Sequence, residues 1–581
     1  TKHKMQVTSE NFEEGFEALR HALRRADFVS VDAEFSGLNS GGPSTHQHDP
    51  VPLYYSKMRE SVSSFMLLQY GVCTFERVRN GRDGSERFVA RPFNFYLFPA
   101  VEKGLPERCF TTQASSFRFL AENNFDFNTC FRKGVSFVTD KQAQRLQADV
   151  LKRTAEEWEP VVLAAKDEAW LAERRTEIEV WLAAGDSKPQ GWLDFASTHG
   201  WNRRILYQMV ELEYPTLHLE AVGTERWRPM RLGLLSEEER LKIVNEQRAK
   251  DQAELVRKLG FWRVFSMLRD YLNDRLDPEE ALPAAAVPTD QSSAEVISPR
   301  PKYLVGHNML LDCMHSVDKF IEELPQSVLD FKDTLAKELP NLVDTKVLAT
   351  HSSIKDVVQS TVLGDLYETI MSKTSLSIVC PPGFEGYLKD TNAQLHDAGY
   401  DAYITGCSYL GLHKLCDLSG NGALEFEERI LNHLNLTRSA NTLVIGREDA
   451  NVPRKGVYWL RKLAPDFEFA SVLQPFQAEF GRVWLSKLDE CSALISIQPP
   501  PGVDFASWDP TPSPKLRDAF AGMLFTYEEY VAACYADAQA KRTSSTGGDQ
   551  SVIGSKRKAV DQGENDRSPP VKSSLDICVI C

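Results

Sequence analysis

The segment Ala26-Asp-Phe-Val-Ser-Val-Asp-Ala-Glu-Phe-Ser-Gly37 decides how this chain folds and which chemistry it can carry. Its apolar run predicts a β-strand, and residues 11–25 before it predict a helix with one apolar face. Residues two apart in a strand point to the same side, so Asp32 and Glu34 can reach one site. Two adjacent buried acids repel each other unless a cation neutralises them. The segment therefore predicts an α/β layer ending in a metal site, the alternative being an edge strand with solvated acids.

Two further motifs can complete this site. Val305-Gly-His-Asn-Met-Leu-Leu-Asp312 predicts a strand that turns into a helix, with Asp312 about one turn inside it. His396-Asp-Ala-Gly-Tyr-Asp401 places a histidine and a carboxylate on either side of a helix start. Taken alone, Asp312 could be a helix cap or a satisfied core acid, and His396 a surface histidine. Together, the carboxylates and the histidine form the set needed for two-metal hydrolysis of phosphodiesters, with His396 able to accept a proton near neutral pH.

These motifs, Asp-x-Glu, Asn-x3-Asp and His-x4-Asp in this order, resemble the exonuclease motifs of the DEDD superfamily in its histidine-type branch. A tyrosine-type member would have tyrosine where this chain has Asp397. Together with Leu342-Val-Asp-Thr-Lys346 and the segment from Leu395 to Gly406, they resemble the poly(A)-specific ribonucleases, deadenylases of the Caf1 group. The resemblance extends over most of the chain, to about residue 500.

The resemblance implies a 3′-to-5′ exoribonuclease that shortens mRNA poly(A) tails by two-metal hydrolysis and releases 5′-AMP. His396 would be the general base. Two Mg²⁺ ions, or Mn²⁺ in their place, would be held by four carboxylates: Asp32, Glu34, Asp312 and Asp401. Because all of these positions are intact, catalysis is expected. Asp344, in the fourth motif, is expected to be a structural acid.

Contacts to single-stranded RNA 3′ ends are expected in two places. Phe35 and Lys346 are candidates beside the catalytic site, although Lys346 could equally be a surface lysine. Nucleases of this kind carry an inserted module with an Arg-x3-His signature, which Arg203 and Tyr207 match with tyrosine replacing histidine. An arginine for phosphate and an aromatic ring for base stacking would suit single-stranded RNA. The alternative is an ordinary helix with its apolar side chains in the core.

The predicted fold class is α/β. A ribonuclease-H-like exonuclease domain with a mixed sheet, residues 1–165 and 259–432, is expected to be split by a small α+β insertion domain at 166–258. An α+β domain at 433–530 resembles an RNA-recognition motif, and a disordered tail is expected at 536–581. Residues 277–301, rich in proline, alanine and serine, are expected to be a flexible insertion.

Aromatic residues decide what the last domain can bind. RNA-recognition motifs stack bases on sheet aromatics, and the predicted strands at 442–445 and 493–497 contain none. In this family the domain can bind the mRNA 5′ cap through a tryptophan, at a position that is Lys487 here. This departure makes 5′ cap binding doubtful, and Trp484, three residues earlier, is interpreted as a core residue.

Composition excludes several classes of protein. With 581 residues and a formal net charge of −15, the chain cannot hold nucleic acid by bulk positive charge, so RNA contacts must be local. No apolar run approaches the roughly 18 residues of a membrane span. The eleven scattered cysteines form neither a disulfide framework nor a complete zinc site, which fits a reducing compartment. A location in nucleus and cytoplasm is expected, partly from the basic Lys556-Arg-Lys558, and the family resemblance implies a homodimer.

Other interpretations stay open. Residues 417–428 match the spacing of a single calcium loop, and Cys578-Val-Ile-Cys581 has the spacing of a prenylation box. A rival function is a trimmer of 3′ extensions of small non-coding RNAs, a branch whose members often carry a C-terminal membrane segment. A rival from another class is a catalytically silent RNA-binding scaffold, which would usually have lost a metal ligand.

Overall fold

The computed structural model describes residues 5–545, except for 40, 42–43, 80–85, 102–103, 155–160, 186–190, 197–198, 224–228, 235, 277–300, 355, 389–394, 417–425, 427 and 505–506. The predicted flexible insertion therefore lies outside the described residues apart from its last position. Most of the segment with calcium-loop spacing, the basic segment at 556–558 and the residues with prenylation-box spacing at 578–581 lie outside them as well.

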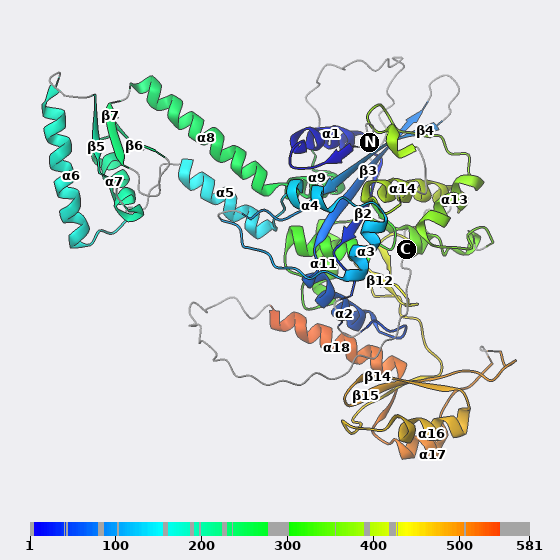
Figure 1. Ribbon diagram of the computed structural model, residues 1–581. Helices are drawn as coiled ribbons and strands as arrows, with labels where there is room; N and C mark the ends of the chain where they lie inside the picture. The colour runs from blue at the N-terminus through cyan, green and yellow to red at the C-terminus, as the bar shows by residue number, and fades with distance from the viewer. Residues whose placement is uncertain are drawn as a thin grey trace. The chain divides into compact units, whose positions relative to one another are not determined.

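The chain divides into two compact units, one made of Thr1–Asp140 with Gly260–Cys581 and the other of Lys141–Leu259. Figure 1 shows the elements of each unit. None of the helices within the described ranges is long and apolar enough to cross a membrane.

A mixed sheet forms the centre of the first unit. Among the described residues it has seven strands in the order β1-β4-β3-β2-β8-β9, with β10 paired to β4. The pairs β4-β3 and β3-β2 are antiparallel and the others parallel. The strands are β1 (Met5–Val7), β2 (Phe28–Phe35), β3 (Leu67–Arg79), β4 (Glu86–Tyr96), β8 (Tyr303–Gly306), β9 (Leu342–Asp344) and β10 (Ile378–Val379). The predicted mixed α/β fold is confirmed.

Helices cover this sheet on both sides. α1 shows why: its apolar residues share one face, with acids in its first turn and arginines in its last, as the helix dipole favours. The helical elements of the unit up to residue 415 are α1 (Phe12–Arg25), α2 (Val51–Ser64), α3 (Ala114–Glu122), α4 (Phe127–Lys133), α9 (Phe261–Leu272), α10 (Leu310–Ser316), η2 (Val317–Ile321), α11 (Val328–Glu338), α12 (Thr345–Leu348), η3 (Ser352–Ile354), α13 (Leu363–Lys373), η4 (Glu385–Leu388) and α14 (Ala398–Leu415).

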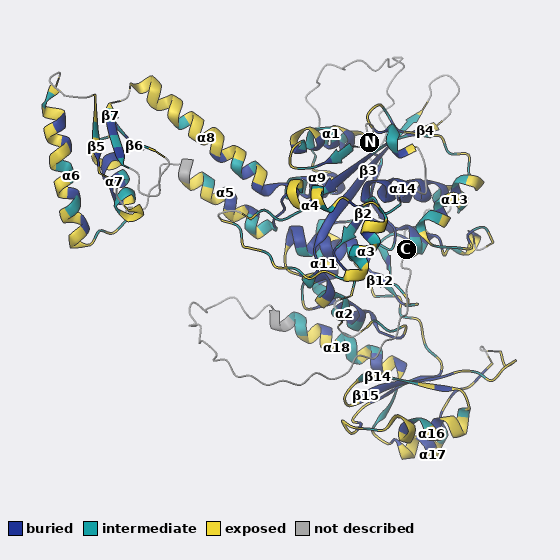
Figure 2. Cartoon of the chain, viewed as in Figure 1, coloured by how far each residue is buried: buried dark blue, intermediate teal, exposed yellow. Residues whose placement is uncertain are grey.

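Helix α14 is the most deeply buried of these. All of its residues from Ala398 to Leu412 are buried, and it packs against β2, β3 and β4. Figure 2 shows this helix and the neighbouring strands mostly in dark blue. A helix surrounded on all sides must be apolar on all sides, so the acid Asp401 near its start is the exception that needs a partner.

The second unit has its own core. It contains α6 (Ala165–Ala183), β5 (Trp192–Phe195), α7 (Gly200–Glu213), β6 (Leu217–Ala221), β7 (Met230–Leu234) and α8 (Glu237–Leu259), and α5 (Asp140–Thr154) leads into it. Its three described strands form an antiparallel sheet in the order β5-β7-β6. Side chains of α6, α7 and one face of this sheet make a separate apolar cluster.

A small antiparallel sheet follows the nuclease-like part of the first unit. Its order is β14-β15-β13-β16, formed by β13 (Val457–Leu460), β14 (Val483–Asp489), β15 (Ser492–Ile497) and β16 (Leu524–Thr526). Helices α16 (Phe469–Phe480) and α17 (Pro514–Ala519) cover one face, and α18 (Tyr527–Ser545) packs on the other. α18 runs past residue 536, so the disorder predicted from that position was wrong as far as Ser545.

Two other predictions for this region were wrong. The strand predicted at 442–445 is present as β12 (Thr442–Val444), but its assignment to the last domain was wrong: it pairs with β11 (His433–Asn435) and packs into the main core through Leu434 and Leu443. Trp484 is 54% exposed, so it is not a core residue. Alternate residues of a strand face opposite sides, and its neighbours, the buried Val483 and the half-buried Leu485, take the side that faces the helices.

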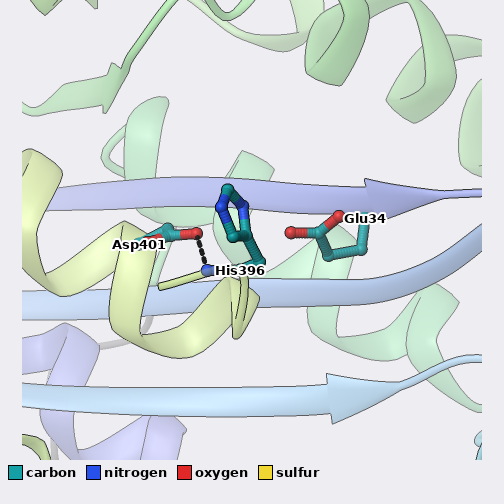
Figure 3. Close-up of side chains that lie close together, drawn as sticks. All are labelled: Glu34, His396 and Asp401. Carbon is teal, nitrogen blue, oxygen red and sulfur yellow. Dashed lines mark hydrogen bonds between the residues drawn. The ribbon is translucent and has the colours of Figure 1, made fainter. Parts of the chain in front are cut away.

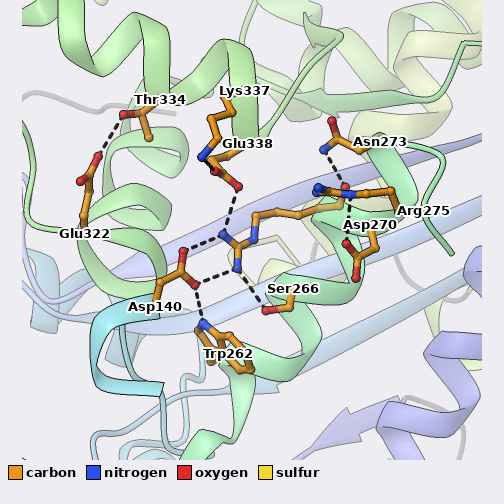
Figure 4. Close-up of polar contacts among 11 residues, drawn as sticks. Asp140, Trp262, Ser266, Asp270, Asn273, Arg275, Glu322, Thr334, Lys337 and Glu338 are labelled. Carbon is orange, nitrogen blue, oxygen red and sulfur yellow. Dashed lines mark hydrogen bonds and ion pairs between the residues drawn. The ribbon is translucent and has the colours of Figure 1, made fainter. Parts of the chain in front are cut away.

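The chain leaves the first unit and returns to it at adjacent points. The backbone N–H of Phe261 donates to the carbonyl of Ser136 at 2.7 Å, and Gly260 has a φ of +47°, which a side chain would disfavour. Nearby, the buried Arg269 bonds to both carboxylate oxygens of Asp140 at 2.8 Å and to Glu338 at 3.1 Å. Figure 4 shows this network, in which the Trp262 indole also donates to Asp140.

Candidate active site

The acidic residues predicted from the sequence come from three separate elements. Asp32 and Glu34 lie at the end of β2, Asp312 in the first turn of α10, and Asp401 in the first turn of α14. Because β2 pairs with β8, the strand that precedes α10, the fold carries Asp312 to the acidic end of β2. α14 packs across β2 and brings Asp401 there as well.

Glu34, His396 and Asp401 form the tightest part of the site. Each offers a nitrogen or oxygen atom that lies within 4.8 Å of those of the other two. Figure 3 shows the Glu34 carboxylate directed toward His396. Within the described ranges, this is the group of acidic, histidine and cysteine side chains close enough to hold a metal ion.

A strained turn presents His396 to this group. The φ of His396 is +70°, a conformation that costs free energy for any residue except glycine. Its backbone N–H donates to Oδ2 of Asp401 at 2.8 Å. The next residue, Asp397, caps α14 by accepting the Tyr400 N–H at 3.1 Å, and its carbonyl accepts the N–H of Asp401 at 2.9 Å. The spacing of five residues between His396 and Asp401 is therefore set by a helix cap and the turn in front of it.

The buried carboxyl groups of the site repel each other and need a cation to neutralise them. Burial raises the pKa of both Asp32 and Glu34 well above the usual value for a carboxyl group, and the charges of Asp401 and Asp312 raise both further. Burial also raises the pKa of Asp312, to about 7. Oxygen donors that repel each other in this way fit hard divalent cations such as Mg²⁺ and Mn²⁺, which would favour their ionised forms.

Asp344 has a different environment from these acids. It is fully buried, and backbone N–H groups of Asn308, Lys346 and Asn435 donate to its carboxylate at 2.8 to 3.0 Å. A carboxylate surrounded by three N–H donors has its acceptor capacity used within the protein. This arrangement is that of a structural acid.

Aromatic rings flank the site on two sides. Phe35 is half-buried and stacks on His315, with ring centroids 4.2 Å apart. Phe119 of α3 meets the His396 ring edge to face at 4.3 Å, a contact that limits how that ring can turn. The sequence interpretation missed Phe119, because its aromatic-rich surroundings at 117–131 give no local link to His396.

The remaining predicted RNA contacts belong to two other helices. Lys346 is half-buried in α12, two residues after Asp344. Arg203 and Tyr207 lie one turn apart on α7 in the second unit, both half-buried. The same helix buries Ile205, Leu206 and Met209, as the core interpretation predicts, and Tyr207 packs against their cluster.

Comparisons with known proteins agree with the motifs. The CAF1 family ribonuclease model matches residues 7–409. The poly(A)-specific ribonuclease PARN of Xenopus laevis is 26% identical over 569 residues, which cover 93% of this chain and 83% of that protein. The human protein of the same name is 28% identical over 571 residues, covering 93% and 82%. The structure of S. pombe Pop2p in its Mg²⁺- and Mn²⁺-bound form is 13% identical, with a TM-score of 0.33 and coverage of 74% and 98%. The predicted resemblance to the poly(A)-specific ribonucleases is confirmed.

Proposed function

Because this chain belongs to the CAF1 family of ribonucleases and is therefore a 3′-to-5′ exoribonuclease, we propose that it shortens the poly(A) tails of mRNA and releases 5′-AMP. The observation that carries the proposal is the cluster of Glu34, His396 and Asp401 within 4.8 Å, beside two further acids on β2 and α10. Relatives named as poly(A)-specific ribonucleases across 93% of the chain support poly(A) as the substrate.

The acidic residues fit a pair of divalent metal ions. Asp32, Glu34, Asp312 and Asp401 would hold Mg²⁺ or Mn²⁺, because carboxylate oxygens are the ligands these ions prefer. Such ions, when bound, supply positive charge to the reacting phosphate and lower the pKa of water.

His396 is suited to take a proton from the attacking water. Burial lowers the pKa of His396 from its usual value of 6.5, so the ring is neutral near pH 7, the form in which an imidazole can accept a proton. The hydrogen bond from its backbone to Asp401 and the ring of Phe119 fix its orientation. A fixed neutral imidazole beside the metal ligands is the arrangement that general-base catalysis requires.

Contacts to the RNA strand are proposed for residues beside the site and in the second unit. The half-buried ring of Phe35 can stack on a base, and the ammonium group of Lys346 can pair with a phosphate. Arg203 and Tyr207 of α7 offer the same two kinds of contact at the second unit. A homodimer and a location in nucleus and cytoplasm are further proposals, and sedimentation of the purified chain tests the dimer.

The small sheet supports an RNA-recognition-motif-like domain at 457–526. Its elements follow the order β13-α16-β14-β15-α17-β16, and four antiparallel strands with two helices on one face are the elements of that domain. The face that normally stacks bases carries Trp459 and Phe525, but Tyr530 of α18 packs against Trp459 with ring centroids 5.1 Å apart. The part of the face under α18 is thus occupied by the chain itself.

A time course on end-labelled RNA tests the proposed function. RNAs ending in oligo(A), oligo(U) or a blocked 3′ end would each be incubated with Mg²⁺ and with EDTA. Stepwise loss of the oligo(A) tail alone, dependent on metal and on a free 3′ hydroxyl, is expected. Equal trimming of both tails would remove the adenine preference and favour a trimmer of small RNAs. Binding without shortening would favour the silent scaffold.

A further inference from the structure

Three side chains from distant parts of the sequence are hydrogen-bonded in series beside His396. Nδ2 of Asn94 donates to Oε1 of Gln6 at 2.8 Å, and Nε2 of Gln6 donates to Oδ2 of Asp397 at 3.1 Å. Gln6 lies in β1 and faces Asn94 in the register of the parallel pair β1-β4. Asp397 directly follows His396. We call Asn94, Gln6 and Asp397 the amide relay.

The donors and acceptors of the relay can be arranged in one way only, and Asp397 determines which. A carboxylate can only accept hydrogen bonds, so Gln6 must turn its NH₂ group toward Asp397 and its carbonyl toward Asn94. Asn94 must then donate. Its own carbonyl oxygen is buried and has no hydrogen-bond partner among the described residues. An unsatisfied buried oxygen destabilises the fold, so an apolar residue at this position would serve stability at least as well.

Asp397 connects the relay to the strained turn. One oxygen of its carboxylate accepts from Gln6, and the other accepts the Tyr400 N–H and so caps α14. The relay also lies directly against this helix, since a Cβ at Gly399 would be 2.8 Å from Cβ of Asn94. The first turn of α14 is thus held from β1 and β4 at the point where the positive φ of His396 begins.

From this geometry we infer that the amide relay positions His396 for catalysis. A non-glycine residue stays at a φ of +70° only when its surroundings fix it there. The relay supplies such a restraint from strands that do not carry any of the proposed metal ligands. Gln6 and Asn94 are therefore positioning residues that act through Asp397. The inference rests on the proposed function of His396 as the base.

Gln6→Met tests the relay. Methionine is similar in length to glutamine but makes neither hydrogen bond, so the turn loses its restraint while the packing at β1 is kept. The expected result is a fall in kcat of about tenfold on oligo(A) RNA, because displacements well under 1 Å already reduce the rate of a positioned group. KM should be almost unchanged, because neither Gln6 nor Asp397 is a proposed RNA contact.

Asp397→Asn should keep the kcat that Asp397→Ala loses. An asparagine keeps the helix cap through its carbonyl, and its NH₂ group then faces Gln6. Rotating the amides of Gln6 and Asn94 reverses the relay, and the unpartnered Asn94 oxygen becomes its new acceptor. Asp397→Asn is therefore expected to keep most of kcat, and Asp397→Ala to lose it. In the Gln6→Met background this advantage of asparagine should shrink to what the helix cap alone contributes.

Asn441→Leu is the matched control. Asn441 is also a buried amide, and it donates to the carbonyl of Asp49 and the hydroxyl of Tyr527, away from the catalytic residues. This variant should lower Tm and leave kcat unchanged. A Gln6→Met protein with unaltered kcat, or an Asp397→Asn protein as slow as Asp397→Ala, would overturn the inference. If the unaltered chain shortens no RNA at all, the proposed function itself fails, and the role of the relay fails with it.

Discussion

The backbone N–H of His396 donates a hydrogen bond to Oδ2 of Asp401 at 2.8 Å, so one contact ties the proposed base to a proposed metal ligand. Ligand atoms of His396, Asp401 and Glu34 lie within 4.8 Å of one another. The position of the base therefore depends on the same carboxylate that would hold the metal.

Asp401→Asn separates these two roles. The asparagine carbonyl can keep the bond to His396, but the negative charge for the metal is lost. We expect kcat to fall at least about 100-fold, since even indirect support of a metal ligand has effects of that size. In EDTA the same variant should be more stable than the unaltered protein by about 1 kcal/mol, because a charge that raises the pKa of Asp32 and Glu34 has gone. Lower stability in EDTA would contradict the account of a repelling acid cluster.

The pH dependence of kcat reports on His396. Burial lowers its pKa from 6.5, so the neutral form persists to lower pH than for an exposed histidine. As far as His396 determines it, kcat should be constant above pH 6.5 and should fall at lower pH, where the ring becomes protonated. His396→Ala should lower kcat by about 10²- to 10⁴-fold and remove that acidic limb. An unaltered limb in this variant would assign it to another group.

Stability without metal should fall as pH rises. A carboxyl group whose pKa is raised on folding stabilises the fold when protonated, and this contribution is lost as pH rises through the folded-state pKa, about 7 for Asp312. Tm in EDTA is therefore expected to decrease from pH 6 to pH 8 relative to Tm in Mg²⁺. Thermal melts at both pH values measure the difference, with Asp312→Asn as the control that reduces it. A gap between the two curves that does not widen with pH would exclude the acid cluster as the metal site.

Arg269 is expected to matter for folding and not for chemistry. It is 9% exposed and pairs with Asp140, which would lose this cation in Arg269→Met, and with Glu338, which would keep only the exposed Lys337. Removing one partner of a buried ion pair costs about 3–5 kcal/mol. Urea unfolding measures this loss, and Asp140→Asn with Arg269→Met should recover part of it. Near-normal stability of the single variant would show that the network in Figure 4 contributes little.

The sequence predicted the residues of the candidate site because their signals are local. The apolar run of β2 ends in acids two residues apart, and the cap at Asp397 marks the start of α14, so each motif carries its own geometry. Periodicity and capping act over a few residues, so both can be recognised in a single sequence.

The residues that were missed or misplaced depend on contacts across the chain. Gln6 and Asp397 are 391 positions apart, and nothing near either one indicates the other. Trp484 was interpreted as a core residue, although the alternation along β14 turns it outward. β12 follows β11 into the main core, a choice of partner that strand propensity does not determine.

The bond between Phe261 and Ser136 also bears on how a protein of this architecture can be assembled from parts. The chain departs after Asp140 and re-enters at Gly260, and the two ends are already joined by backbone hydrogen bonding and by the Trp262 contact to Asp140. The first unit therefore holds these two chain ends together by its own contacts, whatever the length of the segment between them. We therefore expect that residues 141–259 can be replaced by a short turn or by another module while β4 and α9 keep their places.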